Sequence, residues 1–254
     1  MHTYIGINSF PKSGNTWISG IVSYLFFEGD LDAVPSIYTT TPLNAPVYTF
    51  EDMSYSFFRS HSQCPWREIG CDGQSDSTNI HYKYIYIVRH PLDVFLSSLN
   101  WLGNVANMPT YFIGSNIKTV DQIIADGELD YYFSAFLCYM TLQPEFTDAG
   151  RWDYNAIGWK NLANTDDNIS YLRFEDLLAN PVDILTGIFS QLGKSPYDIQ
   201  LALNHFDERY PLDNKFFWTK SANNYKRLIP KELVSKFEYY YSEPLSSLDY
   251  LPLQ

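Results

Sequence analysis

The 254 residues carry 17 basic and 29 acidic side chains, which gives a formal net charge of −12. The length is that of one large domain or two small ones, and the 45% hydrophobic content indicates a globular chain with a substantial core. A strongly acidic chain lacks the basic surface that general nucleic-acid binding needs, so an anionic ligand would have to meet positive charge gathered locally. The abundant aromatic residues (6 Trp, 21 Tyr and 17 Phe) suit either an aromatic core or surfaces that stack on planar ligands.

The sequence shows no sign of a membrane or secreted protein. No segment approaches the roughly 18 consecutive apolar residues of a membrane span, and the N-terminal residues lack a signal-peptide pattern. The three cysteines, Cys64, Cys71 and Cys138, are an odd number without C-x-x-C spacing, which argues against a disulfide framework or a zinc site. We therefore expect a cytoplasmic protein with no nucleic-acid partner, no membrane partner and no bound metal.

Three strand–loop–helix units follow one another along the chain. The three predicted strands are short apolar runs, at residues 4–7, 84–88 and 169–173. The helices that follow them show apolar residues at helical spacing, beginning at Asn15, at Pro91 and at Pro181, and Gly193 provides a C-cap for the last. Strands alternating with helices predict an α/β fold, with a mainly parallel central sheet flanked by helices in three layers. We expect one domain over residues 1–254.

The segments between these units have weaker patterns. Residues 33–53 are rich in Thr and Pro and predict a loop, and residues 103–118 are rich in Asn and Gly and predict a lid or pocket loop. Residues 120–142 favour one helix, residues 207–227 are irregular, and a last helix is expected from Pro230 to Tyr241.

The loop after the first strand has the sequence PKSGNTW and precedes a helix start. Backbone N–H groups in such a turn, with the helix dipole behind them, form an anion-binding nest. Lys12 adds a positive charge, and Ser13, Asn15 and Thr16 add short polar side chains. A Walker A loop places its lysine directly after the second glycine, whereas Lys12 precedes Gly14 by two residues, so a standard P-loop NTPase is disfavoured. On its own the loop is also compatible with an ordinary strand–helix turn.

This loop resembles the phosphosulfate-binding loop, P-K-[SA]-G-[TN]-[TN]-W, of sulfotransferases that use 3′-phosphoadenosine 5′-phosphosulfate (PAPS). The second unit, YIVRHPLDVFLS, resembles the same family's 3′-phosphate motif, in which an arginine and a serine eight residues later hold the 3′-phosphate. A third segment, LRFEDL, is similar to the family's R-Y-E-D-L. The resemblance covers most of the chain. It implies a P-loop-like sulfotransferase architecture, PAPS as the sulfuryl donor and adenosine 3′,5′-bisphosphate (PAP) as the product.

The resemblance also implies which residues bind the nucleotide. The phosphosulfate loop would contribute Lys12, Ser13, Gly14, Asn15, Thr16 and Trp17. Trp17 matches the family tryptophan that packs on adenine, although its place on the helix stripe also suits core burial. Arg89 and Ser97 would hold the 3′-phosphate, and a guanidinium at a strand end can grip a phosphate bidentately. Arg89 is also compatible with a structural ion pair to a carboxylate such as Asp93.

The chain departs from the family pattern at three places. Phe174 stands where the family usually has tyrosine, so it could stack on the nucleotide without a hydroxyl contact. The C-terminal R-K-G-x-x-G-D-W segment is missing, and its stretch keeps only scattered cations: Lys215, Lys220, Lys226 and Arg227. We expect Lys220 or Arg227 to contact the 3′-phosphate, although a basic cluster is also typical of a solvated surface. Asn155 replaces the histidine of a W-x-x-H-type segment.

Sulfuryl transfer depends mainly on positioning and on stabilising charge at the transferring and leaving oxygens. Lys12 is the expected electrostatic catalyst. The acceptor must lose a proton to a base with a pKa near neutrality, and the chain has five histidines. His61 follows an apolar run similar to the family's strand ending K-[TS]-H, which supplies the base. The alternative for His61 is a loop histidine without a role.

The sequence therefore predicts a PAPS-dependent sulfotransferase that modifies a hydroxyl or amine of a small-molecule acceptor, as a monomer or homodimer. Two alternatives stay open. A small-molecule kinase of P-loop type is one, because Ser13 follows Lys12. A family member that binds nucleotide without turnover is the other. The charge of −12 suggests a cationic acceptor from natural product biosynthesis, such as a guanidinium alkaloid, although acidity also keeps an aromatic-rich chain soluble.

Overall fold

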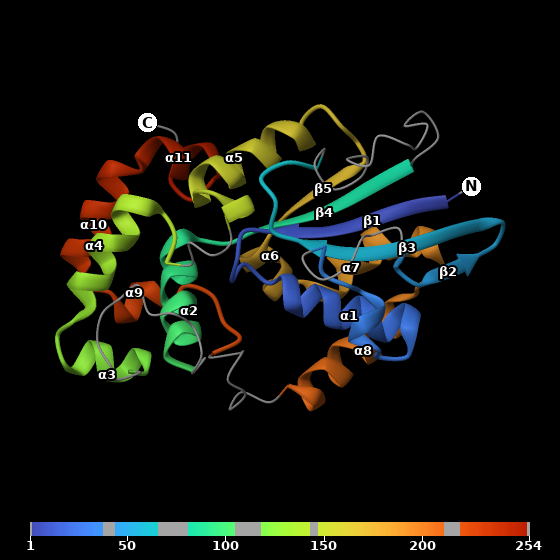
Figure 1. The fold of residues 1–254 in the computed structure, drawn as a ribbon, viewed down its shortest axis with the longest axis horizontal. Coiled ribbons are helices and arrows are strands. Elements are labelled where there is room, and N and C mark those ends of the chain that lie inside the picture. The colour runs from blue at the N-terminus through green and yellow to red at the C-terminus, as the bar shows by residue number, and fades with distance from the viewer. Residues whose placement is uncertain are drawn as a thin grey trace.

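The computed structural model describes residues 2–37, 44–65, 81–104, 118–142, 147–210 and 219–252. Its centre is a 5-stranded sheet in the order β2-β3-β1-β4-β5 (Figure 1). The strands are β1 (His2–Ser9), β2 (Val47–Phe50), β3 (Met53–Ser60), β4 (His81–Val88) and β5 (Ile169–Arg173). All neighbouring pairs are parallel except β2 with β3, which is antiparallel. The expected mainly parallel α/β sheet is confirmed.

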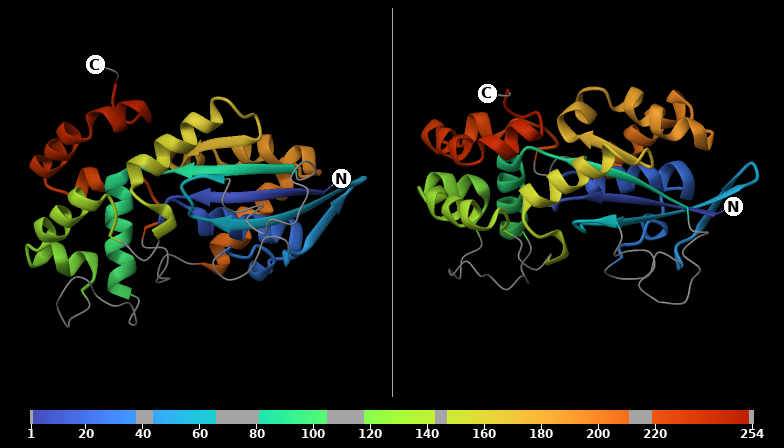
Figure 2. Two further views of the ribbon diagram at one scale, coloured as in Figure 1. Left: turned by 45° about the horizontal axis from the view of Figure 1, so that its top comes forward. Right: turned by 90° about the horizontal axis from the view of Figure 1, so that it is seen from above.

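Helices cover both faces of the sheet and gather beyond the carboxyl ends of its strands (Figures 1 and 2). They are α1 (Asn15–Phe27), α2 (Pro91–Asn104), α3 (Val120–Ala125), α4 (Leu129–Tyr139), α5 (Trp152–Ala163), α6 (Phe174–Ala179), α7 (Pro181–Phe189), α8 (Pro196–Arg209), α9 (Tyr225–Leu228), α10 (Lys231–Tyr240) and α11 (Ser242–Ser247). Short 3-10 turns are η1 (Leu31–Ala33), η5 (Thr147–Ala149) and η6 (Ser190–Leu192). Among the described residues, none of the helices has the length and apolar character needed to cross a membrane.

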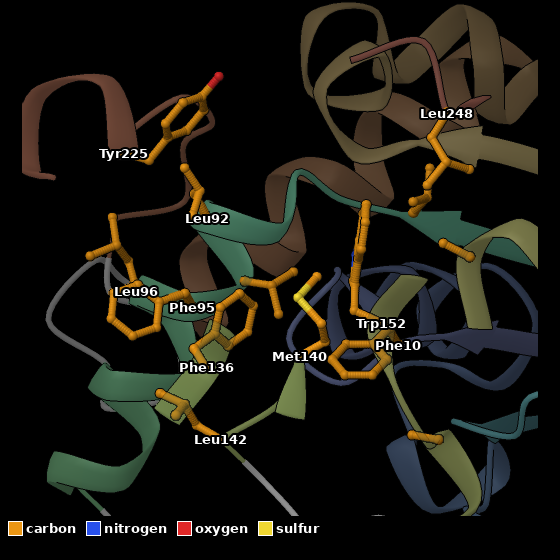
Figure 3. Packing of buried hydrophobic residues seen from close by; sticks show 14 of the residues in the cluster. Phe10, Leu92, Phe95, Leu96, Phe136, Met140, Leu142, Trp152, Tyr225 and Leu248 are labelled. Carbon is orange, nitrogen blue, oxygen red and sulfur yellow. The ribbon is translucent and has the colours of Figure 1, made fainter. Parts of the chain in front are cut away.

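Alternating side chains of the strands build two separate cores. Ile7 and Ile87 point to one face, where they join a cluster with residues of α1, α7 and α8. Tyr84 and Tyr86 point to the other face, where Trp159 of α5 stacks on Tyr86 with ring centroids 5.0 Å apart. The same core continues past the sheet between α2, α4 and the start of α5 (Figure 3). Apolar side chains therefore cover both faces of the central strands β1 and β4, as their continuous apolar runs predict.

The three predicted strands are present, and the helices predicted from Asn15 and Pro91 follow the first two. After β5, α6 comes first; the helix that begins at Pro181 ends at Phe189, and Gly193, with a left-handed φ of 78°, is the C-cap of the 3-10 turn η6 that follows it. The single helix expected over 120–142 is wrong: Gly127, with a φ of 71°, separates α3 from α4. The loop expected over 33–53 is wrong in part because it contains β2, and the irregular stretch expected from 207 begins inside α8 and includes α9. Most of the predicted lid, 105–117, lies outside the described residues.

Candidate active site

A cleft of about 960 Å³ opens where β1, β3 and β4 end. The predicted site residues that line it are Lys12, Gly14, Asn15, Thr16, Trp17, His61, Arg89, Ser97, Phe174 and Lys220. The two that do not are Ser13, which is buried, and Arg227, which is exposed on α9. Residues that are far apart in the sequence therefore meet at one edge of the sheet, where parallel α/β proteins bind ligands.

The phosphate loop has the backbone shape of an anion nest. Lys12 and Gly14 both have positive φ, 68° and 114°, and Gly14 is the N-cap of α1. A Cβ at Gly14 would lie 2.8 Å from the ring of Phe174, so both the dihedral and the space require glycine. The N–H of Trp17 bonds to the carbonyl of Gly14 at 3.0 Å, and the N–H groups of Asn15 and Thr16 precede it at the start of α1, the end of a helix that favours anions.

Lys12 is half-buried between this loop and α2. Its Nζ lies 4.5 Å from the ring centroid of Trp101, an electrostatically favourable position for a cation. Burial, together with the positive charge of Arg89, lowers the pKa of Lys12 to about 8. Lys12 therefore stays mostly protonated at neutral pH.

Arg89 is buried behind the phosphate loop. Its Nη1 donates to the carbonyl of Lys12 at 3.1 Å, and its Nη2 donates to the carbonyl of Ser221 at 3.0 Å. The guanidinium carbon lies 4.5 Å from the ring centroid of Phe174. The Nε of Arg89 is buried and has no hydrogen-bond partner among the described residues.

The ion pair between Arg89 and Asp93, the alternative role considered for this arginine, does not form in the described structure. The carboxylate of Asp93 accepts the backbone N–H groups of Asn223, at 2.6 Å, and Tyr225, at 3.1 Å. Asp93 therefore anchors the segment before α9, and Arg89 keeps donor capacity toward the cleft.

Some of the remaining side chains of the loop are used inside the protein, and others face the cleft. The amide Nδ2 of Asn15 donates to the carbonyls of Ile7, at 3.0 Å, and Ser60, at 2.9 Å, so only its backbone N–H remains for an anion. The Oγ of Ser13 is buried and has no hydrogen-bond partner among the described residues. Trp17 is half-buried and meets Phe174 edge-to-face at 5.9 Å. Thr16 is exposed at the cleft.

A hydrogen bond to the backbone decides the tautomer of His61. Its Nδ1 lies 2.7 Å from the carbonyl oxygen of Ser9. A carbonyl only accepts, so Nδ1 carries the proton and Nε2 carries the lone pair of the neutral ring. Burial lowers the pKa of His61 to about 4, opposed by this hydrogen bond and reinforced by the charges of Lys12 and Arg59. The ring is therefore neutral at physiological pH, with a pKa below the near-neutral value expected of the base.

The C-terminal cations are not equivalent. Lys220 lines the cleft, and its Nζ donates to Asp207 at 2.8 Å. Lys226 and Arg227 are exposed and do not line the cleft, whereas Lys215 lies outside the described residues. Of the two residues expected at the 3′-phosphate, the structure brings only Lys220 to the cleft.

Among the lining residues that were not predicted from the sequence, two lie close to motif residues along the chain. Trp101 lies one helical turn after Ser97 on α2, and Arg59 lies two residues before His61 on β3. Their spacing from motif residues was a usable signal, because side chains one turn apart on a helix share a face. The aromatic residues of α4 do not line the cleft: Phe133 and Phe136 are core residues, and Tyr131 is exposed.

Residues 3–246 match the sulfotransferase domain family, and the chain belongs to it. The mouse (Mus musculus) protein Sulfotransferase 2A1 is 26% identical over 209 residues, which cover 78% of this chain and 63% of that protein. The match thus spans less than two thirds of the relative's length.

Solved structures with the same fold agree with this assignment. Mouse sulfotransferase SULT7A1, complexed with PAP, superposes with a TM-score of 0.65 at 15% identity, over 97% of this chain and 85% of its own. Retinol dehydratase, in complex with androsterone and the inactive cofactor PAP, superposes with a TM-score of 0.62 at 15% identity, over 97% of this chain and 81% of its own. At these identities the likeness establishes the fold.

Proposed function

We propose that this protein transfers a sulfuryl group from PAPS to a hydroxyl or amine of a small-molecule acceptor. The observation that carries the proposal is the meeting of three groups in one cleft: the phosphate loop with Lys12, the buried Arg89, and the neutral His61. Membership of the sulfotransferase domain family supports it. One domain over residues 1–254, a cytoplasmic location and a monomeric or homodimeric state are parts of the same proposal.

The residues of the cleft fit a nucleotide that carries several negative charges. Arg89 lines the cleft, and its Nε is a buried polar atom without a partner among the described residues; such an atom is costly unless a ligand satisfies it. The glycine at position 14 keeps the loop open to a close approach. Ser97 of α2 and Arg89 line the same cleft, and Lys220 adds a further cation. Trp17 and Phe174 supply aromatic surface for a purine.

The chemistry assigned to the chain's own residues is proton transfer and charge stabilisation. When bound, PAPS supplies the sulfuryl group, whose bond to the phosphate oxygen breaks as the bond to the acceptor forms. His61 Nε2 takes the acceptor's proton, and the hydrogen bond from Nδ1–H to Ser9 stabilises the resulting imidazolium. Lys12 and the loop N–H groups stabilise the negative charge that develops on the leaving phosphate.

The charged side chains that line the cleft bear on the class of acceptor that it can bind. The charged side chains that line the described part of the cleft are Lys12, Arg59, Arg89, Lys220 and Asp207, and Asp207 is bonded to Lys220. Among the described residues that line the cleft, the one carboxylate, that of Asp207, is already paired with Lys220. The cationic natural product therefore stays a prediction from net charge alone, without support from this wall. A kinase is disfavoured because β4 leads into Arg89 rather than into a carboxylate that could bind Mg²⁺.

The proposal is tested first by binding. We expect calorimetry to show tight 1:1 binding of PAP, and Arg89→Met to weaken it by roughly 100-fold, the scale of a lost charge-assisted bidentate contact. Lys231→Met, at an exposed position outside the cleft, is the matched control and should leave the affinity unchanged. Absence of PAP binding at millimolar concentration would contradict the proposal. Tight binding without turnover on any acceptor would favour the non-catalytic alternative.

A further inference from the structure

The backbone that carries His61 is held by side chains instead of by the sheet. The register between β1 and β3 ends at the pair Asn8 and Ser60, so residues 61 and 62 lie beyond the ladder. Three consecutive carbonyls there accept hydrogen bonds from buried side chains. The donors are Asn15 Nδ2 to Ser60 O (2.9 Å), Asn155 Nδ2 to His61 O (3.3 Å), and both Trp159 Nε1 (3.0 Å) and Asn8 Nδ2 (3.1 Å) to Ser62 O.

Asn155 is the member of this set that bonds to the histidine itself. It lies on α5, is 0% exposed, and does not line the cleft. Its Nδ2 also donates to the carbonyl of Ala149 at 2.9 Å, and its Oδ1 accepts the hydroxyl of Tyr86 at 2.7 Å. Two carbonyls and one hydroxyl thus use the two donors and the acceptor of the amide, which fixes its orientation. Burial raises the pKa of Tyr86 well above its ordinary value, so its hydroxyl remains a donor.

We propose that Asn155 is a positioning residue for the proton-accepting histidine: the chain Tyr86–Asn155–His61 O fixes the backbone of residue 61. The imidazole is then held with Nδ1 on Ser9 at the wall of the cleft. This inference rests on the proposed function only for the role of His61 as base; the hydrogen bonds stand without it. Asn155 acts through the backbone, because it lies behind the cleft wall and has no access to a ligand there.

Loss of the hydrogen bonds between Tyr86, Asn155 and His61 O has a consequence that a purely structural role does not predict. The ring of His61 is neutral mainly because it is buried, and the charged groups that act on it are Lys12 from the phosphate loop and Arg59 from β3. If residue 61 moves away from Ser9 and admits water, the burial contribution weakens. The pKa of His61 then rises from about 4 toward its ordinary value of 6.5.

The test uses Tyr86→Phe, which keeps the ring packed on Trp159 and removes only the hydroxyl, and Asn155→Asp, which removes both amide donors at constant shape. Tyr82→Phe is the matched control: it removes a tyrosine hydroxyl from the same strand, bonded to Asp166 at 2.8 Å and remote from His61. The readouts are kcat with the full-length enzyme, the PAP dissociation constant, and the pKa of His61 from an NMR titration of its ring protons.

We expect Tyr86→Phe and Asn155→Asp to lower kcat by roughly 10- to 100-fold, to leave PAP affinity within about twofold, and to raise the pKa of His61 by about one unit or more, with Tyr82→Phe unchanged. An unaltered His61 pKa in Tyr86→Phe, or a loss of PAP binding parallel to the loss of kcat, would overturn the proposal, even if Asn155→Asp fails to fold. Because the titration needs no turnover, an inactive wild type with the expected pKa changes would count against the proposed function and not against the positioning role.

Discussion

At the scale of single residues, the positive charge of Lys12 influences the protonation of His61. Both line one cleft, and the charge of Lys12 is among the causes that lower the pKa of His61 to about 4. Burial and Arg89 lower the pKa of Lys12 to about 8. Between these values the pair consists of a protonated lysine and a neutral histidine. That combination is the one in which a base accepts a proton while a cation stabilises the leaving phosphate.

We therefore predict a bell-shaped pH dependence of kcat/KM for PAPS. Activity should rise with pH through about 4, where His61 loses its proton, and fall above about 8, where Lys12 loses its charge. In Lys12→Arg the alkaline limb should disappear below about pH 10, because a guanidinium stays protonated. The measurement is steady-state kinetics across this range, with circular dichroism to exclude unfolding. An alkaline limb that stays near pH 8 in Lys12→Arg would contradict the assignment.

At the scale of elements, the contact between α1 and α8 links the phosphate loop to the far wall of the cleft. Gly20 lies in α1, and a Cβ there would meet the ring of Phe206 at 2.5 Å. Phe206 lines the cleft from α8, and the Nζ of Lys220 lies 5.5 Å from its ring centroid. The close approach of the two helices therefore depends on glycine, although glycine weakens a helix.

This contact gives a stability prediction with an internal control. Gly20→Ala should lower the free energy of unfolding by about 1–3 kcal/mol, the usual cost of overpacking, despite the better helix propensity of alanine. Gly187→Ala, in α7 with no atom within 4 Å of the added Cβ, should instead raise it by up to about 1 kcal/mol. Urea unfolding of both variants followed by circular dichroism measures the difference. Equal free energies of unfolding in the two variants would contradict the prediction, because they would show that α8 can move away from α1 without cost.

Local pattern explains which elements could be predicted from the sequence. Runs such as 84–88 are buried on both faces and lie between clear loops, so their strands were predictable. β2 was missed because it is a four-residue edge strand with alternately exposed and half-buried side chains, and its only partner is β3. The start of α8 has a recognisable sequence pattern that was not used to predict the helix. Ser195 is the N-cap, Pro196 is the first helical residue, and Ser195 and Asp198 form a capping box.

At the scale of the whole molecule, charge is divided between a cationic cleft and an acidic remainder. The net charge is −12, yet four of the five charged side chains that line the described cleft are cations: Lys12, Arg59, Arg89 and Lys220, against Asp207. Focusing of positive charge in a cleft allows an anionic nucleotide to bind an acidic protein. A net charge of −12 is therefore compatible with an anionic ligand in this cleft.

The same distinction explains how far the site could be predicted. Lys12, Arg89 and Ser97 belong to contiguous motifs, so their meeting in one cleft could be expected from strand order. The carbonyl of His61 and the amide of Asn155 are 94 residues apart, and the pairing exists only because α5 packs across β4. Likewise, the amide of Asn15 was expected to serve the ligand but is used to join β1 to β3. Such long-range uses of polar side chains have no local sequence pattern.

Sulfuryl transfer by Lys12 and His61 is tested directly by measuring product formation. The protein would be incubated with PAPS and a mixed panel of hydroxyl- and amine-bearing acceptors, and PAP and sulfated products would be quantified by mass spectrometry. We predict one sulfated product for each PAP formed, with rates at least about 100-fold lower in Lys12→Met and in His61→Ala. Rates in either variant equal to those of the wild type would contradict the account, as would a wild type that binds PAP and sulfates no acceptor.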